Sequence, residues 1–421
     1  MTLYVSDLDG TLLRSDEKTS RYSCEVINLL TSKGMLFAYA TARSLVTAKK
    51  VTAGLDAKIP LIIYNGAFIV DNRSGEILKA NYFDEGVNAL LDRLTEEKIY
   101  PIVYAYIDGQ EKFSYVPSLA NEGQQVFTDT RRGDVRENRI DSMEDLKKGD
   151  IFYITCIDEP GKLEPLYEEY KDIYHCVYQR DIYTGDQWLE IMPREASKAN
   201  AVKQLKEMFG CNRVVAYGDG RNDIDMFEVA DEGYAVANAD EDLKKAATGI
   251  IRSNNEDGVA RHLMEQNGVA LRLAERDDIQ KIWEMQVEGF SDILTKYQDY
   301  DTNPAAESAD RIEARYDMPG SFYYLIEAGG ADVGVIRIVD AGDGSPKRIS
   351  PLWIMPGYRG RGYAQMAMIE AERICGPDNW SLDTILQEKG NLYLYEKMGY
   401  RRVGGTEKIN DKMDIVFYKK D

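Results

Sequence analysis

Two acidic residues stand two positions apart after the first apolar run of the chain. Asp7 and Asp9 follow Leu3–Val5, and Gly10 comes directly after them. A glycine permits the sharp turn that would let both carboxylates face one site. Because acidic turns are also common without function, the pair gains meaning only from other residues of the sequence.

Three further segments carry groups suited to phosphoryl transfer. They supply Thr41, Lys198, Asp219, Asn222 and Asp223. Two unit charges about 4 Å apart repel by about 4 kcal/mol at an effective dielectric of 20. The four acids Asp7, Asp9, Asp219 and Asp223, if clustered, would therefore need a cation, and an all-oxygen ligand set favours Mg²⁺. A metal beside a lysine and a threonine predicts a phosphoryl-transfer site.

Short apolar runs separated by helical patterns predict the elements that position these groups. The runs are Leu3–Val5, Met35–Ala40, Leu61–Tyr64, Val214–Tyr217, Tyr234–Ala237 and Ile250–Ile251. Near-continuous apolar strands that alternate with helices indicate an α/β fold, with a parallel sheet covered on both faces. Because chemistry in such sheets gathers at the carboxyl ends of the strands, we expect the four carboxylates to converge there.

The pattern changes twice along the chain. Residues 82–185 are rich in tyrosine and Gly-Asp turns, which indicates an inserted α/β cap within a core formed by residues 1–81 and 186–264. A new series of strands and a long helix begins at Val269, so residues 269–421 are expected to form a separate mixed α/β domain.

Composition excludes several classes of function. A formal net charge of −20 disfavours nucleic-acid and anionic-membrane partners, and no apolar run reaches the length of a membrane span. The N-terminus lacks the pattern of a signal peptide. Five scattered cysteines without a CxxC motif argue against a disulfide framework or a zinc site and favour the cytoplasm. With two histidines in the chain, carboxylates, lysine and tyrosine must carry the acid–base chemistry.

The order of the acidic motifs resembles the haloacid dehalogenase superfamily over roughly residues 1–264. Asp7-Leu8-Asp9-Gly10-Thr11, then Thr41, Lys198 and Gly218–Asp223, match its four motifs. Asn65-Gly66-Ala67 and Asn238-Ala239 are similar to its Cof-type family IIB, whose members carry a large α/β cap. The resemblance implies a Rossmann-like core and a cap that selects a small phosphorylated metabolite such as a sugar phosphate. Relatives that are phosphomutases share these motifs, so a mutase is an alternative.

The same resemblance implies a role for each residue of the motifs. Asp7 would attack phosphorus and form an aspartyl-phosphate, while Asp9 would protonate the leaving oxygen and then activate water. Mg²⁺ would be held by Asp7, the backbone carbonyl of Asp9 and Asp219, with Asp223 in or near the ligand set. The phosphoryl oxygens would be bound by Gly10, Thr41, Lys198 and Asn222.

A glycine-rich segment in the C-terminal part indicates an anion site. Leu352–Met355 has the pattern of a strand, Pro356–Tyr358 that of a turn, and Arg359–Ala364 opens a helix. Small residues at a helix N-terminus let backbone N–H groups approach a pyrophosphate, and the helix dipole adds to the attraction. A flexible glycine turn beside an exposed basic patch is the alternative.

The segment resembles the coenzyme A motif of the GNAT acetyltransferases, with Arg359, Gly362 and Ala364 at its defining positions, and Asn391–Tyr400 resembles a second family segment. The resemblance covers roughly residues 269–421 and implies acetyl-CoA as cofactor and an amine as acceptor. The implied cofactor contacts are Ile354, Met355, Arg359, Gly360, Arg361, Gly362, Tyr363, Ala364 and Asn391. Tyr395 would be the general acid that reprotonates the thiolate, unless it is a tyrosine of the core.

These resemblances predict a bifunctional enzyme. One alternative makes the C-terminal part a non-catalytic module that binds acetyl-CoA and tunes the phosphatase. A purely structural role conflicts with so many carboxylates at strand ends.

Overall fold

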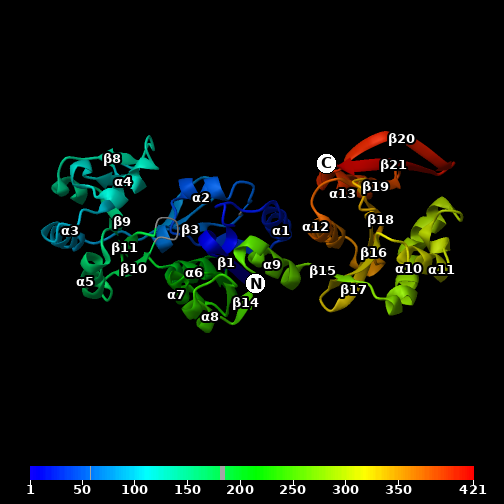
Figure 1. Cartoon of the computed structure of the whole chain (residues 1–421), viewed down its shortest axis with the longest axis horizontal. Helices are drawn as coiled ribbons and strands as arrows, with labels where there is room; N and C mark the ends of the chain where they lie inside the picture. The colour runs from blue at the N-terminus through cyan, green and yellow to red at the C-terminus, as the bar shows by residue number, and fades with distance from the viewer. Residues whose placement is uncertain (57, 181–184) are drawn as a thin grey trace. The chain divides into compact units, whose positions relative to one another are not determined.

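The computed structural model describes residues 1–56, 58–180 and 185–421, and their contacts define two compact units, Met1–Val259 and Ala260–Asp421 (Figure 1). Residues 181–184, which fall within the predicted cap, lie outside the described residues. Within the described part of the chain, no helix combines the length and the apolar character that a bilayer crossing requires.

A five-stranded, fully parallel sheet forms the core of the first unit, in the order β14-β13-β12-β1-β2. The strands are β1 Thr2–Ser6, β2 Leu36–Tyr39, β12 Arg213–Gly218, β13 Glu232–Val236 and β14 Gly249–Ile251. The helices are α1 Arg21–Ser32, α2 Leu45–Val51, α6 Lys198–Met208, α7 Ile224–Val229, α8 Glu241–Ala246 and α9 Gly258–Asn267. The central strands are buried almost throughout, which explains their uninterrupted apolar runs and confirms the predicted parallel sheet.

The run Leu61–Tyr64 departs from that prediction. Its strand, β3 (Leu61–Ile63), meets the parallel sheet at one bridge, Ala40 with Ile62. It pairs instead in an antiparallel three-stranded sheet with β4 (Phe68–Val70) and β5 (Ile77–Ala80). An apolar run looks the same in a parallel and in an antiparallel sheet, because burial, and not strand direction, favours apolar residues.

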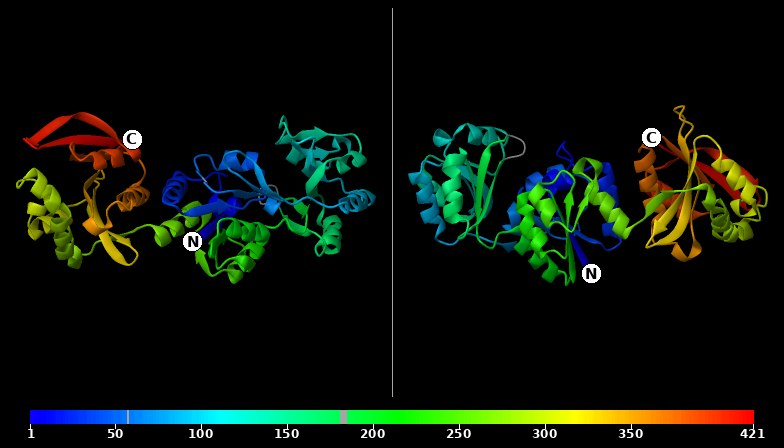
Figure 2. Two further views of the ribbon diagram at one scale, coloured as in Figure 1. Left: turned by 180° about the vertical axis from the view of Figure 1, so that it is seen from behind. Right: turned by 60° about the horizontal axis from the view of Figure 1, so that its bottom comes forward.

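The cap is a six-stranded sheet in the order β10-β11-β9-β6-β7-β8. The strands are β6 Ile102–Ile107, β7 Gln110–Tyr115, β8 Glu137–Arg139, β9 Asp150–Ile157, β10 His175–Arg180 and β11 Gln187–Met192. The helices are α3 Val87–Glu96, α4 Glu122–Asp129 and α5 Pro160–Tyr170. Leucines of α3 and α5 pack against the sheet, and the right-hand view of Figure 2 shows the cap helices beside it. β11 lies beyond residue 185, where the sequence predicts the cap to end, and still pairs with β9 and β10.

The second unit is built on a seven-stranded mixed sheet in the order β15-β16-β17-β18-β19-β21-β20. The strands are β15 Ala270–Leu273, β16 Ser321–Ala328, β17 Ala331–Val339, β18 Lys347–Ile354, β19 Trp380–Ile385, β20 Arg401–Asn410 and β21 Met413–Lys420. The helices are α10 Ile279–Tyr297, α11 Ala309–Tyr316, α12 Tyr363–Cys375 and α13 Lys389–Lys397. α10 and α11 pack on one face of the sheet, and α12 lies on the other (Figure 2).

The middle of this sheet is split between two neighbouring parallel strands. β18 and β19 pair at two positions only, Lys347 with Trp380 and Arg348 with Ser381. Beyond them β18 continues along β17, and β19 continues along β21. The separation leaves strand edges unpaired inside the domain, where a ligand with polar groups along its length can bind.

A glycine brings the loop after β3 against the start of α6, the helix that carries Lys198. Gly66 has a φ of +99°, and a Cβ atom there would lie 2.2 Å from the backbone oxygen of Ser197. Ser197 in turn caps α6, because its side chain accepts a hydrogen bond from the backbone N–H of Asn200 at 3.1 Å. The close approach therefore fixes the end of the helix that presents Lys198.

Gly66→Ala is expected to destabilise the protein by roughly 2–4 kcal/mol, because the side chain would force backbone against backbone. Gly34→Ala is a matched control, since Gly34 has the same φ of +99° but no atom within 4 Å of its Cβ position. The control should cost about 1 kcal/mol through backbone strain alone. Urea unfolding of both variants measures the difference, and equal losses would contradict the proposed clash.

Candidate active sites

The ends of β1 and β12 bring three carboxylates together. Asp7 follows β1, while Asp219 and Asp223 follow β12, and one oxygen from each lies within 4.8 Å of the others. Parallel pairing of these neighbouring strands places their carboxyl ends at the same edge. Gly10, with a φ of +73°, permits the approach, because a Cβ atom there would lie 2.1 Å from Asp219 Oδ2.

Lys198 is the cation inside this acidic cluster. Its Nζ donates to Asp7 Oδ1 at 2.6 Å and to Asp223 Oδ1 at 2.7 Å, and its side chain is 2% exposed. The second oxygen of Asp223 accepts the backbone N–H groups of Asp219 and Gly220, both at 3.1 Å. One lysine therefore neutralises part of a cluster that carries three carboxylates.

The remaining charge appears in the pKa values of the cluster. Burial, followed by the charges of Asp223, Asp219 and Asp9, raises the pKa of Asp7 well above its ordinary value, although Lys198 opposes the shift. Burial and the charge of Asp223 raise the pKa of Asp219 to about 7. The pKa of Lys198 is raised because the attraction of Asp223 and Asp7 exceeds the effect of burial. Such a set of oxygens fits a divalent cation that would relieve the repulsion.

The side chain of Asp9 lies outside the cluster of three, although its charge still raises the pKa values of Asp7 and Asp219. Arg43 binds it through two nitrogens, with Nη2 at 2.6 Å from Oδ1 and Nε at 2.9 Å from Oδ2. Arg43 also pairs with Glu17 at 3.2 Å. A guanidinium fork offers two donors to one carboxylate, so this bond turns Asp9 away from the other acids.

The hydroxyl and amide residues predicted to bind phosphate lie at the same strand ends. Thr41 follows β2 and is fully buried, and its Oγ1 accepts the backbone N–H of Arg43 at 3.1 Å. Thr11 Oγ1 donates to Asp219 Oδ1 at 3.2 Å. Asn222 lines a cavity that Asp219 also lines.

A cavity of about 460 Å³ lies between the core and the cap. The core contributes residues such as Asp9 and Arg43 to its lining, and the cap contributes aromatic side chains and two arginines. These cap residues are Tyr104, Phe113, Phe127, Tyr153, Trp188, Arg131 and Arg136. The guanidinium of Arg131 lies 3.4 Å from the centre of the Phe127 ring. Aromatic walls with a few charged groups suit a small polar metabolite.

The cap residues that line this cavity were not predicted from the sequence. Arg136 is bound by Glu111 and Asp134, each at 2.7 Å, and Asn65 donates to Tyr153 Oη at 3.0 Å. These partners are separated by up to 88 positions in the chain. The sequence signal for the cavity was weak: a buried charged residue within an apolar run, such as Glu190 between Leu189 and Ile191.

In the second unit, the predicted cofactor loop lies exposed at the start of α12. Gly360 and Gly362 adopt positive φ angles of 78° and 82°. The side chain of Arg359 folds back, donating to Ile354 O at 3.0 Å and Gly289 O at 2.6 Å. The first backbone N–H groups of a helix have no acceptor within it, so Tyr363 and Ala364 begin a surface that can bind an anion.

Tyr395 lies on α13 and lines a cavity of about 590 Å³. Asn391, also predicted near the cofactor, lines the same cavity, whereas Met355 packs in the core under α10. Burial raises the pKa of Tyr395 to about 12, although a hydrogen bond with Thr384 opposes the shift. The phenol is therefore protonated at neutral pH, the state that an acid requires.

Asp219→Asn is expected to stabilise the metal-free protein and to abolish stabilisation by Mg²⁺. The folded pKa of about 7 lies above the ordinary value of 3.8, so the contribution of this group is most favourable below pH 3.8 and is lost as pH rises toward 7. At pH 8 in EDTA the variant should melt higher, by roughly 2–4 °C for each kcal/mol gained.

Thermal unfolding of the N-terminal unit, followed in EDTA and in MgCl₂, measures both effects. Glu228→Gln removes an exposed carboxylate and should melt like the wild type in both buffers. A melting temperature of Asp219→Asn below that of the wild type in EDTA would contradict a metal-binding cluster. A wild-type melting temperature that does not change with Mg²⁺ would contradict it as well.

Known proteins match the two units separately. Residues 4–263 match the haloacid dehalogenase-like hydrolase family, and residues 280–400 match the acetyltransferase (GNAT) family. The 5-amino-6-(5-phospho-D-ribitylamino)uracil phosphatase YwtE of Bacillus subtilis is 30% identical over 274 residues, which are 60% of this chain and 94% of that protein.

Solved structures give the same result for the first unit. A haloacid dehalogenase-like hydrolase from Bacteroides thetaiotaomicron is 26% identical, with a TM-score of 0.52 over 62% of this chain and 98% of that one. The subclass IIB sugar phosphatase BT4131 is 20% identical and shares the fold, with a TM-score of 0.51 over 62% of this chain and 98% of that one. The chain therefore belongs to the haloacid dehalogenase-like hydrolase family and continues into a GNAT acetyltransferase domain.

Proposed function

We propose that the N-terminal unit is a Mg²⁺-dependent phosphatase that acts on a small phosphorylated metabolite through an aspartyl-phosphate at Asp7. The observation that carries this proposal is the buried cluster of Asp7, Asp219 and Asp223 with Lys198 at its centre. Asp7, Asp219, Asp223 and the backbone carbonyl of Asp9 would hold the metal. Bound there, Mg²⁺ neutralises the acids and the negative charge of the phosphoryl oxygens.

The residues of the chain divide the reaction into two steps. A carboxylate oxygen of Asp7 bonds to phosphorus as the bond to the leaving oxygen breaks, and Asp9 gives that oxygen its proton. Water then attacks the aspartyl-phosphate, Asp9 takes the proton from water, and inorganic phosphate leaves. Lys198 and Thr41, with Asn222, hold the phosphoryl oxygens in both steps. Arg43 positions Asp9 at the floor of the cavity between core and cap.

The cap cavity is the proposed site for the rest of the metabolite. Its volume of about 460 Å³ suits a small molecule, and its rings offer flat surfaces to a sugar or a heterocycle. Sugar phosphates and 5-amino-6-(5-phospho-D-ribitylamino)uracil, the compound named for the relative from Bacillus subtilis, are therefore the first substrates to test. The five cysteines are all free thiols, which supports the cytoplasm as the compartment.

Asp7→Asn is expected to lower Mg²⁺-dependent phosphate release by at least about 1,000-fold, because an amide cannot form the aspartyl-phosphate. Release is measured across a panel of sugar phosphates, nucleotides and the pyrimidine compound, in Mg²⁺ and in EDTA. Asp16→Asn changes an exposed acid of the same loop and should retain activity. Activity retained by Asp7→Asn would overturn the proposal, and turnover that requires a sugar bisphosphate would identify a mutase instead.

For the C-terminal unit, we infer acetyl transfer from acetyl-CoA to an amine. The glycine loop Arg359–Ala364 offers backbone donors for the pyrophosphate, and the split between β18 and β19 offers strand edges, near Ile354, for the pantetheine arm. The amine attacks the thioester carbonyl and the C–S bond breaks, while Tyr395 protonates the sulfur as it leaves; the nitrogen releases a proton to water, and the tyrosine regains one from water. The protonated state of Tyr395 supports that assignment.

Tyr395→Phe is expected to lower kcat for acetyl transfer by roughly 100-fold while leaving acetyl-CoA binding unchanged, since it removes the acid but not the binding loop. Release of the CoA thiol measures turnover, and calorimetry measures binding. Tyr393→Phe, at an exposed position of the same helix, is the control. A non-catalytic sensor would bind acetyl-CoA without turnover in every variant, and full activity of Tyr395→Phe would exclude this tyrosine as the acid.

A further inference from the structure

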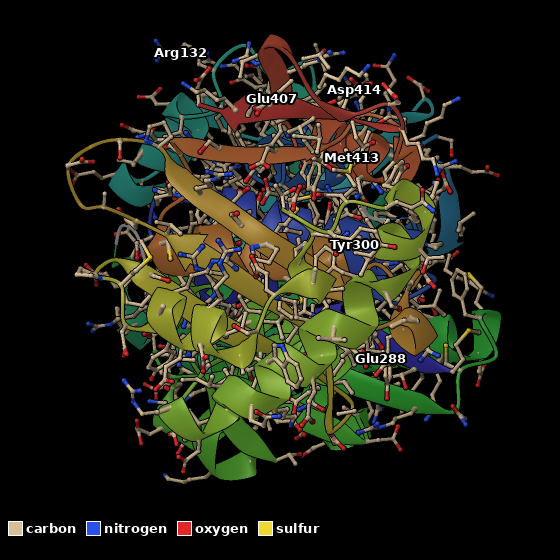
Figure 3. All side chains as sticks on the ribbon, turned by 90° about the vertical axis from the view of Figure 1, so that its right-hand side faces the viewer. Arg132, Glu288, Tyr300, Glu407, Met413 and Asp414 are labelled. Carbon is tan, nitrogen blue, oxygen red and sulfur yellow. The ribbon has the colours of Figure 1, made fainter. Side chains whose placement is uncertain are left out.

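The cavity beside Tyr395 is lined by Arg337, which forms no ion pair with a carboxylate of the described residues. The cavity, about 590 Å³ in volume, is enclosed by α10, α13, strands β17–β21 and the segment from Asp299 to Glu307. Figure 3 views this domain from the side of α10, with Glu407 and Met413 labelled on the two strands that border the cavity. Apolar side chains line much of it, namely Phe290, Ile293, Leu352, Ile385, Ile409, Ile415 and Phe417.

Arg337 lies on β17 and is 7% exposed. Its Nε donates to Ser321 Oγ at 3.0 Å, and its Nη1 donates to Ser350 O at 2.9 Å. The guanidinium carbon lies 5.6 Å from the centre of the Tyr323 ring. Among the described residues, all these partners are neutral, and no carboxylate forms an ion pair with Arg337.

The other arginines of the cavity are each neutralised. Arg315 binds Glu307 at 2.7 Å, and Arg348 forms an ion pair with Asp383. Glu307 is held further by Gln286, whose Nε2 donates to it at 3.1 Å. The remaining acids of the cavity wall are Asp299, which accepts hydrogen bonds from its own turn, and the exposed Glu407. Arg337 is thus the cavity-lining arginine with no acidic partner among the described residues.

A buried cation is costly unless an anion or strong acceptors compensate it. Burial, together with the charges of Arg315 and Arg348, lowers the pKa of Arg337, although Tyr323 and Glu307 oppose the shift. The charge of Arg337 is therefore only partly compensated within the protein. In a chain of net charge −20, a buried arginine without a carboxylate ion pair among the described residues is a local feature of this cavity.

We propose that Arg337 binds an anionic group of the acetyl acceptor, so that the acceptor is an amine that carries a carboxylate or a phosphate. This inference rests on the proposed acetyl transfer by the same domain. The anion binds the guanidinium, the apolar walls contact the body of the molecule, and the amine reaches the thioester on the side of Tyr395. Amines that lack the anionic group leave the buried charge unpaired and bind poorly.

A structural role for Arg337 is the competing explanation, because its hydrogen bonds connect β17 to Ser321 of β16 and to Ser350 of β18. The two explanations differ in their dependence on the acceptor. If Arg337 is structural, its loss lowers turnover of every acceptor equally. If it binds an anion, its loss lowers turnover only of acceptors that carry the anion.

The test compares matched acceptors with the full-length chain and acetyl-CoA, following release of the CoA thiol. One arm compares amino acids with their carboxamides, and the other compares glucosamine 6-phosphate with glucosamine. The anionic member of at least one pair should have a kcat/KM at least about 10-fold higher. Arg337→Gln should lower that value by about 10- to 100-fold and change the neutral member by less than about 3-fold. The arm that responds identifies carboxylate or phosphate.

Three controls separate the outcomes. Arg348→Gln removes an arginine that is already paired, and Ser321→Ala removes a structural hydrogen bond while keeping the charge of Arg337; both should preserve the preference. Arg337→Lys should retain part of it. Equal losses for charged and neutral acceptors in Arg337→Gln, or a preference for neutral amines in the wild type, would overturn the inference.

A binding measurement makes the inference independent of turnover. Anionic amines from the responding class should raise the melting temperature of wild type but not of Arg337→Gln, with acetyl-CoA binding unchanged in both. Thermal shifts without turnover would refute acetyl transfer and leave the anion site standing. The absence of any shift and of any anionic preference across the panel would refute the anion site.

Discussion

The repulsion among three carboxylates at the ends of β1 and β12 is the constraint on which the first unit depends. Asp7, Asp219 and Asp223 approach within 4.8 Å, and Lys198 donates to Asp7 and Asp223. Ser197 caps the helix that carries this lysine, and Gly66 admits the neighbouring loop. One buried lysine therefore compensates part of the acidic cluster, and the proposed divalent cation and phosphoryl group would bind there.

Arginine side chains lie at both proposed substrate sites of this acidic chain. In the first unit Arg43 binds Asp9 at the floor of the cap cavity, and arginines of the cap line its wall. In the second unit Arg337 reaches a cavity without an acidic partner among the described residues. In a chain of net charge −20, these arginines are the groups to which the proposals assign the binding of small anions.

Much of the fold could be predicted because its strands are buried on both faces. The apolar runs at Leu3–Val5 and Val214–Tyr217 correspond to β1 and β12, and their carboxyl ends carry the acids as expected. The prediction was wrong where the burial of a strand does not reveal its direction or its sheet. Leu61–Ile63 was predicted as a strand of the parallel sheet but pairs antiparallel, and β11 lies within residues assigned to the core but pairs in the cap sheet.

The sequence by itself determined where candidate reactive groups stand in local elements, because Asp7 follows an apolar run that forms a strand and Lys198 opens a helix. Tertiary structure alone decided which groups share a site. It turned Asp9 onto Arg43, across 34 positions of the chain, and left Arg337 facing a cavity instead of an acid. Ion pairs and cavities depend on distances between elements that are remote in the chain, and no local periodicity records those distances.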